Sequence, residues 1–273
     1  MSTNVFGFIF RPVVLKYIDM NAIGLEQLKK IKLSCNVLKI IACVSMFVDH
    51  IGSGIIHNYL KIRGMELAPS AYTTLQNTYE CCKGFGRLAF PIFAFFLVEG
   101  FLRTRNVKKY AIRLGIFALI SEIPFDYGMF GSFFYMEHQN VILSLFIALI
   151  MLIVIRYLEG NVLGLSNTVK YLALICTVIA FADIAYLLKT DYTWKCMLLT
   201  AVLYFFRSTG PFRLIAGAAS MCWEKYAPAS FVLLYFYDPE QKPRFKYAFY
   251  VFYPLHIIII GIIAHLLIYG SLL

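Results

Sequence analysis

An adjacent aspartate and histidine, Asp49 and His50, lie inside an apolar run of this sequence. Ionisable groups within a membrane cost several kcal/mol each, so they are candidate functional residues by default. A neutral imidazole near pH 7 suits proton removal from an amine or a hydroxyl, which makes His50 a candidate general base. Neighbouring helical residues point about 100° apart, so Asp49 does not easily orient His50, which needs a partner from another helix. Gly52 and Gly54 would let that helix approach closely. The alternative interpretation is a structural hydrogen-bonding pair between helices.

Further polar residues fall near the same predicted depth, in the outer third of the membrane. They come from six different spans or span ends, and chance scatter would not favour one level. We therefore predict a polar outer chamber with Asp49, His50, Arg87, Asp126, Asn140 and Asp191 as catalytic candidates. His256 is a seventh candidate, predicted near mid-depth below that chamber. Arg87 could instead reach the outer headgroups, and His256 could be a packed core histidine.

The densest basic segment follows the second predicted span, and it would lie in the cytoplasm. Four or five cations in one short turn could bind the phosphates of a cytosolic ligand. The alternative is a topology anchor, and for Glu99, at the end of the preceding span, an ion pair with Arg103 or Arg105. The candidate ligand-binding residues are Glu99, Arg103, Arg105, Asn106, Lys108, Lys109, Tyr110 and Arg113.

The elements that position these residues are apolar helices. The chain has 273 residues, 60% of them hydrophobic and 15% charged, against about 45–50% apolar and about 25% charged in soluble domains. We predict an all-α, polytopic bundle of about nine spans, with eight or ten as alternatives. The last short spans could be tilted, broken or re-entrant. The predicted spans lie near 36–57, 86–103, 109–125, 140–158, 169–188, 194–208, 211–223, 227–237 and 247–269.

The charges set the orientation and the domain plan. With a cytoplasmic N-terminus, 18 of the 25 Lys and Arg residues fall on the cytoplasmic side, as the positive-inside rule expects. We predict a cytoplasmic or interfacial segment over 1–35, with an amphipathic helix near 18–33, and a transmembrane domain over 36–273. No cleavable signal peptide is evident, and the expected location is the cell (inner) membrane. The net charge of +10 fits anionic headgroups better than nucleic acid.

The seven cysteines lack the spacing of a metal site, so we expect free thiols and no metal. Neither a glycine-rich nucleotide loop nor a serine nucleophile elbow is recognisable.

Several runs together resemble the TraX family of membrane proteins, from about residue 36 onward and in order. They are LKIIACVSMFVDHIG, GRLAFPIFAFFLVEGFLRTRNVKKYAIRLGIFALISEIPFD, QNVILSLFIAL, DYTWKCMLL and KYAFYVFYPLHIIII. Thr193 departs from the family pattern, which has glycine there. The resemblance implies a bacterial membrane acetyltransferase with acetyl-CoA as donor. Carried over by matching position, its polar residues are Asp49, His50, Arg87, Glu99, Arg105, Asn106, Asp126, Asn140, Asp191 and His256.

The resemblance and the residue pattern lead to one expected function. An acetyl group would pass from cytosolic acetyl-CoA, held at the basic turn, to an amine or hydroxyl acceptor near the outer face. The acceptor is unknown: a protein N-terminus, a glycan or a small compound. The oxyanion would be stabilised by Arg87, Asn140 or a backbone amide, and an acyl-histidine intermediate is an alternative to direct transfer. The rival functions are a proton-coupled transporter that uses the buried His/Asp cluster and a non-catalytic scaffold.

Overall fold

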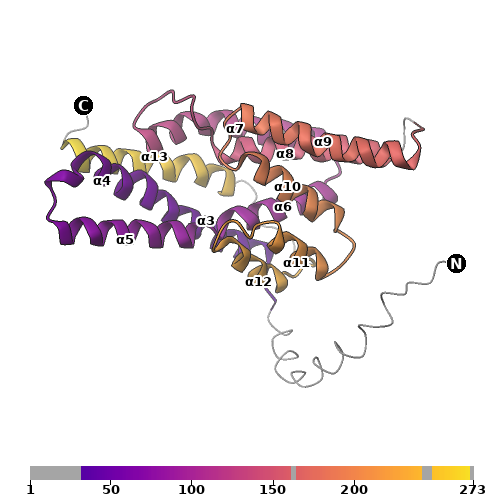
Figure 1. Cartoon of the computed structure of the whole chain (residues 1–273), viewed down its shortest axis with the longest axis horizontal. Coiled ribbons are helices and arrows are strands. Elements are labelled where there is room, and N and C mark those ends of the chain that lie inside the picture. The colour runs from indigo at the N-terminus through magenta and orange to yellow at the C-terminus, as the bar shows by residue number, and fades with distance from the viewer. Residues whose placement is uncertain (1–31, 161–163, 242–247, 271–273) are drawn as a thin grey trace, which may run out of the picture.

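The computed structural model describes residues 32–160, 164–241 and 248–270. Within these ranges the chain is helical and forms no strand, although two isolated bridges join Leu33 to Tyr237 and Gln139 to Thr190. Figure 1 shows the helices running roughly along one long axis of the bundle. The all-α prediction is confirmed. The amphipathic helix predicted near 18–33 lies almost wholly outside the described residues.

The first two predicted spans are parts of one long helical hairpin. Its first arm runs through α3 (Cys35–His50), the π-helical η1 (Ile51–His57), α4 (Asn58–Arg63) and the short η2 (Gly64–Glu66). Its second arm is α5 (Pro69–Gly86) followed by α6 (Ala89–Arg103). The arms are 32 and 35 residues long. The segment between the two predicted spans is therefore helical, and Pro69 begins α5 at a position where its missing N–H costs nothing.

Four further long helices complete the frame. Asn106 caps α7 by accepting from the Lys109 N–H, and Asn140 caps α8 by accepting from the Ile142 and Leu143 N–H groups. Gly131 ends α7 in the left-handed conformation with φ 68°. The bounds are α7 Val107–Phe130, α8 Val141–Glu159, α9 Asn167–Leu187 and α13 Ala248–Tyr269.

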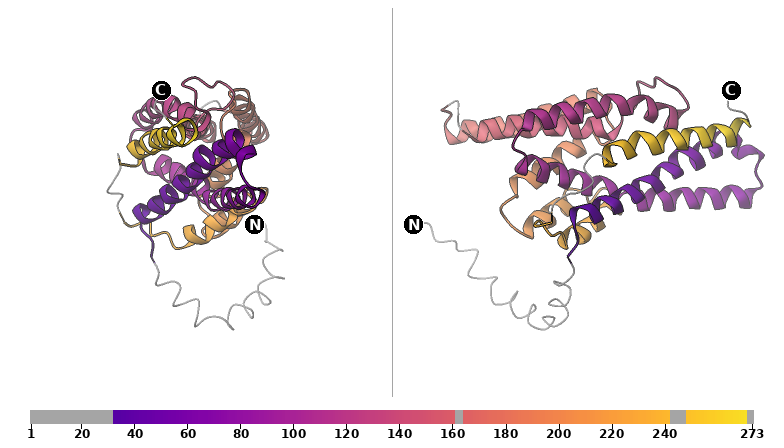
Figure 2. Two further views of the ribbon diagram at one scale, coloured as in Figure 1. Left: turned by 90° about the vertical axis from the view of Figure 1, so that its left-hand side faces the viewer. Right: turned by 180° about the vertical axis from the view of Figure 1, so that it is seen from behind.

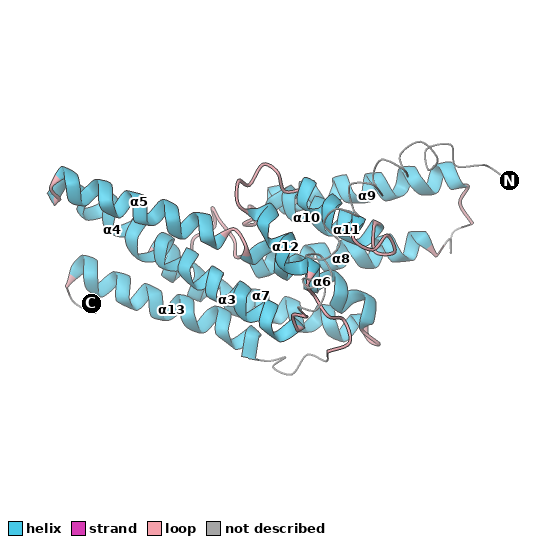
Figure 3. Cartoon of the chain, turned by 90° about the horizontal axis from the view of Figure 1, so that it is seen from below, coloured by secondary structure: helices cyan, strands magenta, loops and turns pink. Residues whose placement is uncertain are grey.

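Three short helices lie between α9 and α13 (Figure 3). They are α10 (Thr193–Phe205), α11 (Phe212–Ala219) and α12 (Ser230–Tyr235), the last preceded by η3 (Ala227–Ala229). The first packs against α6, α8 and α9, the third packs against α6, and the second packs between these two. Five helical segments of the described chain are long and apolar enough to cross a membrane. The nine-span count and the cytoplasmic N-terminus stay predictions.

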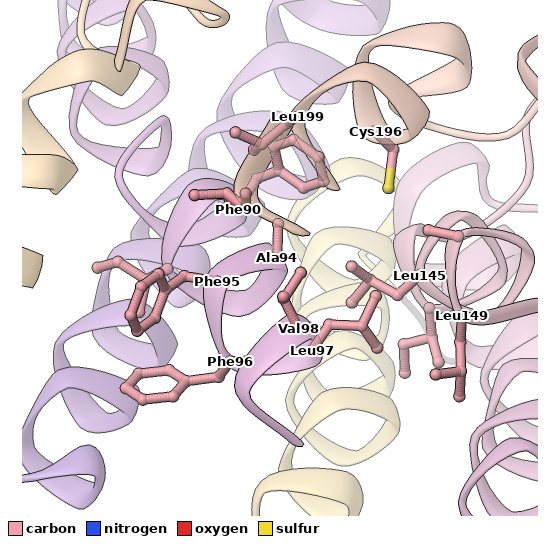
Figure 4. Packing of buried hydrophobic residues seen from close by; sticks show 14 of the residues in the cluster. Phe90, Ala94, Phe95, Phe96, Leu97, Val98, Leu145, Leu149, Cys196 and Leu199 are labelled. Atoms are coloured by element: carbon pink, nitrogen blue, oxygen red, sulfur yellow. The ribbon is translucent and has the colours of Figure 1, made fainter. Parts of the chain in front are cut away.

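The core of the bundle is built around α6. Phe90, Phe95 and Val98 are buried against neighbouring helices, among them Leu145 of α8 and Leu199 of α10 (Figure 4). By contrast, only 11% of the apolar window of α9 lies inside the molecule, so this helix presents its outer surface to lipid. Figure 2 shows the α3–α5 hairpin and α13 at one end of the elongated bundle, and α8 and α9 at the other.

Candidate active site

The π-helical segment η1 begins immediately after His50. Such widened turns are rare and frequently occur at functional sites. A Cβ on Gly54, within η1, would lie 2.6 Å from the Ile260 Cγ2 atom and 2.9 Å from the Gly128 carbonyl oxygen. Only glycine allows α7 and α13 to approach η1 this closely, as the sequence pattern indicated. This contact brings α13, with His256, against the end of α3.

His50 and His256 form a buried pair. The two rings are nearly parallel, with centroids 5.0 Å apart and planes at 14°. The Nδ1 atom of His50 lies 2.7 Å from the Nε2 atom of His256. His50 is 8% exposed and His256 4%. The partner from another helix that His50 needs is therefore His256. This histidine was predicted to lie below His50, but it lies at the same level.

The hydrogen bonds of this pair fix where the protons lie when both rings are neutral. The Nδ1–H group of His256 donates to the Phe252 carbonyl oxygen at 2.6 Å. The Nε2 atom of His256 is then an acceptor, so it receives the Nδ1–H group of His50. This leaves a lone pair on Nε2 of His50. A neutral imidazole held in this tautomer can accept a proton at Nε2.

A cavity of about 410 Å³ runs between α3, α6, α7, α8 and α13. Cations stand at one end, where Arg103 and Arg113 line it together with Lys39. The opposite end is lined by Met46, Val141 and Tyr253. The ring of Tyr253 is edge-on to both histidines, with centroids 6.0 Å from His50 and 5.8 Å from His256. Neither histidine lines the cavity. The cavity leads from a basic mouth to Tyr253, which contacts both imidazole rings.

The predicted ligand-binding residues divide into two groups at this mouth. Glu99, Arg103, Tyr110 and Arg113 line the cavity. The others are exposed residues outside its lining: Arg105, Asn106, Lys108 and Lys109.

Sequence reasoning missed Lys39, whose Nζ atom lies 5.3 Å from the ring centroid of Phe96 and 5.5 Å from that of Phe249. Its position one helical turn inside the first apolar run was the available signal. It also missed the tyrosines Tyr237, Tyr250 and Tyr253 of the lining.

Glu99 is held by two arginines. Its carboxylate accepts from Arg213 at 2.6 Å and pairs with Arg103 at 2.8 Å. Glu99 and Arg213 are both buried. The ion pair with Arg103 was the alternative interpretation of Glu99, and the arrangement ties α6 to α11 at the mouth of the cavity.

The other outer-chamber candidates have partners of their own and do not join the histidines. Asp49 pairs with Lys83 at 2.9 Å, and Arg87 with Glu224 at 3.2 Å. The Asp126 carboxylate accepts from the Tyr135 N–H at 2.8 Å.

Asn140 donates to the Glu122 carboxylate and to the Ala118 carbonyl. Asp191 bonds His138 at 3.2 Å, and this hydrogen bond raises the pKa of that histidine, which lies in the loop between α7 and α8.

Together, the fold and the site define a helical membrane protein with a buried histidine pair beside a cation-lined cavity. The family model described as TraX protein matches residues 34–264, so the chain belongs to the TraX family. A relative from Dichelobacter nodosus, "Probable fimbrial assembly protein FimC, serogroup H1", is 30% identical over 254 residues. The match covers 84% of this chain and 95% of the relative. No solved structure matches the chain.

Proposed function

We propose that this protein is a membrane-bound acetyltransferase that moves an acetyl group from cytosolic acetyl-CoA to an amine or hydroxyl acceptor. The observation that carries the proposal is the His50–His256 pair, which lies beside the end of the cavity opposite its cation-lined mouth. A base with a free lone pair and a passage from a phosphate-binding mouth are the two parts that such a transfer needs.

The cavity fits the narrow part of the donor. Lys39, Arg103 and Arg113 would bind the phosphates at the mouth. The apolar walls formed by Phe93, Leu97 and their neighbours would take the pantetheine arm. A volume of about 410 Å³ is within the usual range of small-molecule pockets. The nucleotide portion would remain at the cytoplasmic surface, near the exposed Arg105, Lys108 and Lys109.

The proposed reaction uses His50 as the general base. Nε2 of His50 takes the proton from the acceptor as its nitrogen or oxygen attacks the thioester carbonyl carbon. The carbon–sulfur bond then breaks, and the thiolate of CoA takes up the proton. His256 positions the base, because its hydrogen bond to Nδ1 of His50 holds the ring in the competent tautomer. The same lone pair would serve an acyl-histidine intermediate.

The acceptor is proposed to be a component of the cell envelope. The Dichelobacter nodosus relative is named as a fimbrial assembly protein, which makes the terminal amine of a fimbrial subunit the first acceptor to test. A small amine and a sugar hydroxyl are the next two.

The first prediction concerns His50. His50→Ala should lower acetyl transfer from labelled acetyl-CoA by about 10²-fold or more, since it removes the general base. Stabilisation of the detergent-solubilised protein by acetyl-CoA against heat should persist in this variant. His57→Ala is the matched control, because His57 lies on the same arm but stacks on Tyr79. Wild-type turnover by His50→Ala would rule out His50 as the base.

The same preparation tests the rival transporter function. A proton-coupled transporter reconstituted in liposomes would move protons across the bilayer without acetyl-CoA and would not be stabilised by it. We expect no proton movement in the absence of acetyl-CoA, and we expect acetyl-CoA to stabilise the protein.

A further inference from the structure

The hydroxyl group of Tyr253 is buried without a hydrogen-bond partner among the described residues. The side chain is 3% exposed and lines the cavity at the end opposite the basic mouth. A buried hydroxyl without a partner costs roughly 1–3 kcal/mol, so its presence needs an explanation. A ligand that enters the cavity would supply the missing partner.

Tyr253 also contacts both histidines. It precedes His256 by about one helical turn on α13, and its ring meets the rings of His50 and His256 edge-on, at 76° and 77°. Val141, the first residue of α8, lines the same end of the cavity. Its backbone amide lies near the phenol oxygen, so what the hydroxyl lacks is an acceptor for its proton.

The two side chains predicted from the sequence for the oxyanion already have partners. Arg87 is paired with Glu224, which also binds Lys195 at 2.8 Å. The side-chain amide of Asn140 donates to Glu122 and Ala118. Neither residue lines the cavity. A donor for the developing negative charge must therefore come from another residue, and an unpartnered hydroxyl stands beside the base.

We propose that Tyr253 donates a hydrogen bond from its hydroxyl to the carbonyl oxygen of the donor thioester and stabilises the oxyanion of the tetrahedral intermediate. This inference rests on the proposed acetyl transfer and specifies where in the cavity the reacting carbonyl is held. As the acceptor atom bonds to the carbonyl carbon, the carbonyl π electrons move to the oxygen. The Tyr253 O–H group then donates a stronger hydrogen bond to that oxygen and keeps its proton. The electrons return when the carbon–sulfur bond breaks.

The test is Tyr253→Phe, which keeps the ring and removes the hydroxyl. Loss of an oxyanion donor lowers kcat by about 10²–10³-fold. We expect that fall with the KM for acetyl-CoA changed by less than about 2-fold, because the interaction forms mainly in the transition state. Tyr269→Phe is the matched control, because Tyr269 is on the same helix but outside the lining of the cavity. It should keep kcat within about 3-fold, since its exposed ring lies against His265 near the end of α13, away from the histidine pair.

The outcomes separate the two proposals. Normal kcat in Tyr253→Phe, with His50→Ala inactive, overturns the role of Tyr253 and leaves the acetyl transfer standing. Wild-type protein that neither binds acetyl-CoA nor transfers its acetyl group overturns the proposed function itself.

Folding is not expected to confuse the result, since the hydroxyl proton has no acceptor to lose and only the Val141 N–H, at the start of α8, loses a nearby oxygen. The melting temperature of Tyr253→Phe should stay within a few degrees of wild type. If it falls further, fluorotyrosine at position 253 is the second variant. It retains the hydroxyl and should keep most of the activity, and its inactivity in a folded protein would contradict the proposal.

Discussion

The imidazole of His50 obtains its orientation from a residue 206 positions later in the chain. The sequence singled out both histidines and indicated that His50 needs a partner from another helix, but it placed His256 at a lower depth. That estimate counted residues inward along each helix from an assumed common membrane surface. The helices are in fact staggered along the long axis (Figure 2), and a stagger changes relative depth without leaving a mark in the local sequence.

At the scale of single residues, several polar side chains pair with partners that the sequence did not indicate. Asp49 was predicted to face a shared chamber, yet it pairs with Lys83 across the hairpin. Lys83 belongs to a polar segment that had been predicted to lie outside the spans. A pairing of this kind depends on a helix, α5, that the hydrophobicity pattern did not predict.

The buried ion pair of Glu99 gives a prediction on stability. Glu99→Gln leaves the charge of Arg213 buried without its counter-ion, which typically costs about 3–5 kcal/mol. We therefore expect a large fall in the thermal midpoint of the solubilised protein, in the absence as well as in the presence of acetyl-CoA. The measurement is a melting curve followed by circular dichroism.

A second ion pair serves as the control for Glu99. Arg207 and Glu159 are 3.0 Å apart and partly exposed, so Arg207→Gln should cost no more than about 1 kcal/mol. Equal effects of the two substitutions would contradict a special structural role for Glu99.

At the scale of the elements, the long apolar helices were predictable and the polar one was not. The predicted spans at 86–103, 140–158, 169–188 and 247–269 agree within a few residues with α6, α8, α9 and α13. Hydrophobic length marks these segments directly. The helix α5 carries Thr, Gln and Asn residues, so it lacks the apolar pattern of a membrane span. Its first residue, Pro69, is the local sequence feature that indicates the start of a helix. The π turn after His50 has no sequence signature beyond the two glycines.

The close packing of helices at Gly54 leads to a prediction about stability and activity. Gly54→Ala places a Cβ 2.9 Å from the Gly128 carbonyl oxygen, a backbone atom that cannot turn away as a side chain can. We expect a loss of about 1–3 kcal/mol of stability, together with reduced acetyl transfer because α13 would be pushed away from α3. Thermal melting and turnover are measured on the same sample.

Gly84→Ala is the appropriate comparison. Its Cβ would meet the ring of Tyr226 at 3.0 Å, and because that residue is 48% exposed, its side chain has room to shift. This variant should remain close to wild type in both measurements. A Gly54→Ala protein as stable and active as Gly84→Ala would show that the close approach is not required.

For the whole molecule, the length of the hairpin constrains how the bundle lies in the bilayer. The first arm of the hairpin has 32 residues, which is about 48 Å of helix against an apolar core of about 30 Å. The arm therefore either tilts strongly or extends beyond the lipid. The predicted cytoplasmic N-terminus would place the turn at Gly64–Glu66 on the outer side of the membrane.

Cysteine labelling would test that orientation. In a background where the exposed Cys81, Cys176 and Cys222 are serine, a membrane-impermeant maleimide on intact cells should label Met65→Cys and not Arg105→Cys. Met65 is fully exposed at the hairpin turn, whereas Arg105 lies at the basic end. After permeabilisation both should react. Labelling of position 105 alone in intact cells would reverse the topology.

The position of His50 within the hairpin has a consequence for the acceptors that the proposed acetyl transfer would allow. His50 is the sixteenth residue of a 32-residue arm, so roughly 24 Å of helix stands on either side of it. His50 is 8% exposed. For the proposed acetyl transfer, an acceptor would therefore have to be narrow enough to reach a buried base: a single extended chain end or a slender metabolite would meet that requirement, and a loop that leaves and re-enters a folded protein would not.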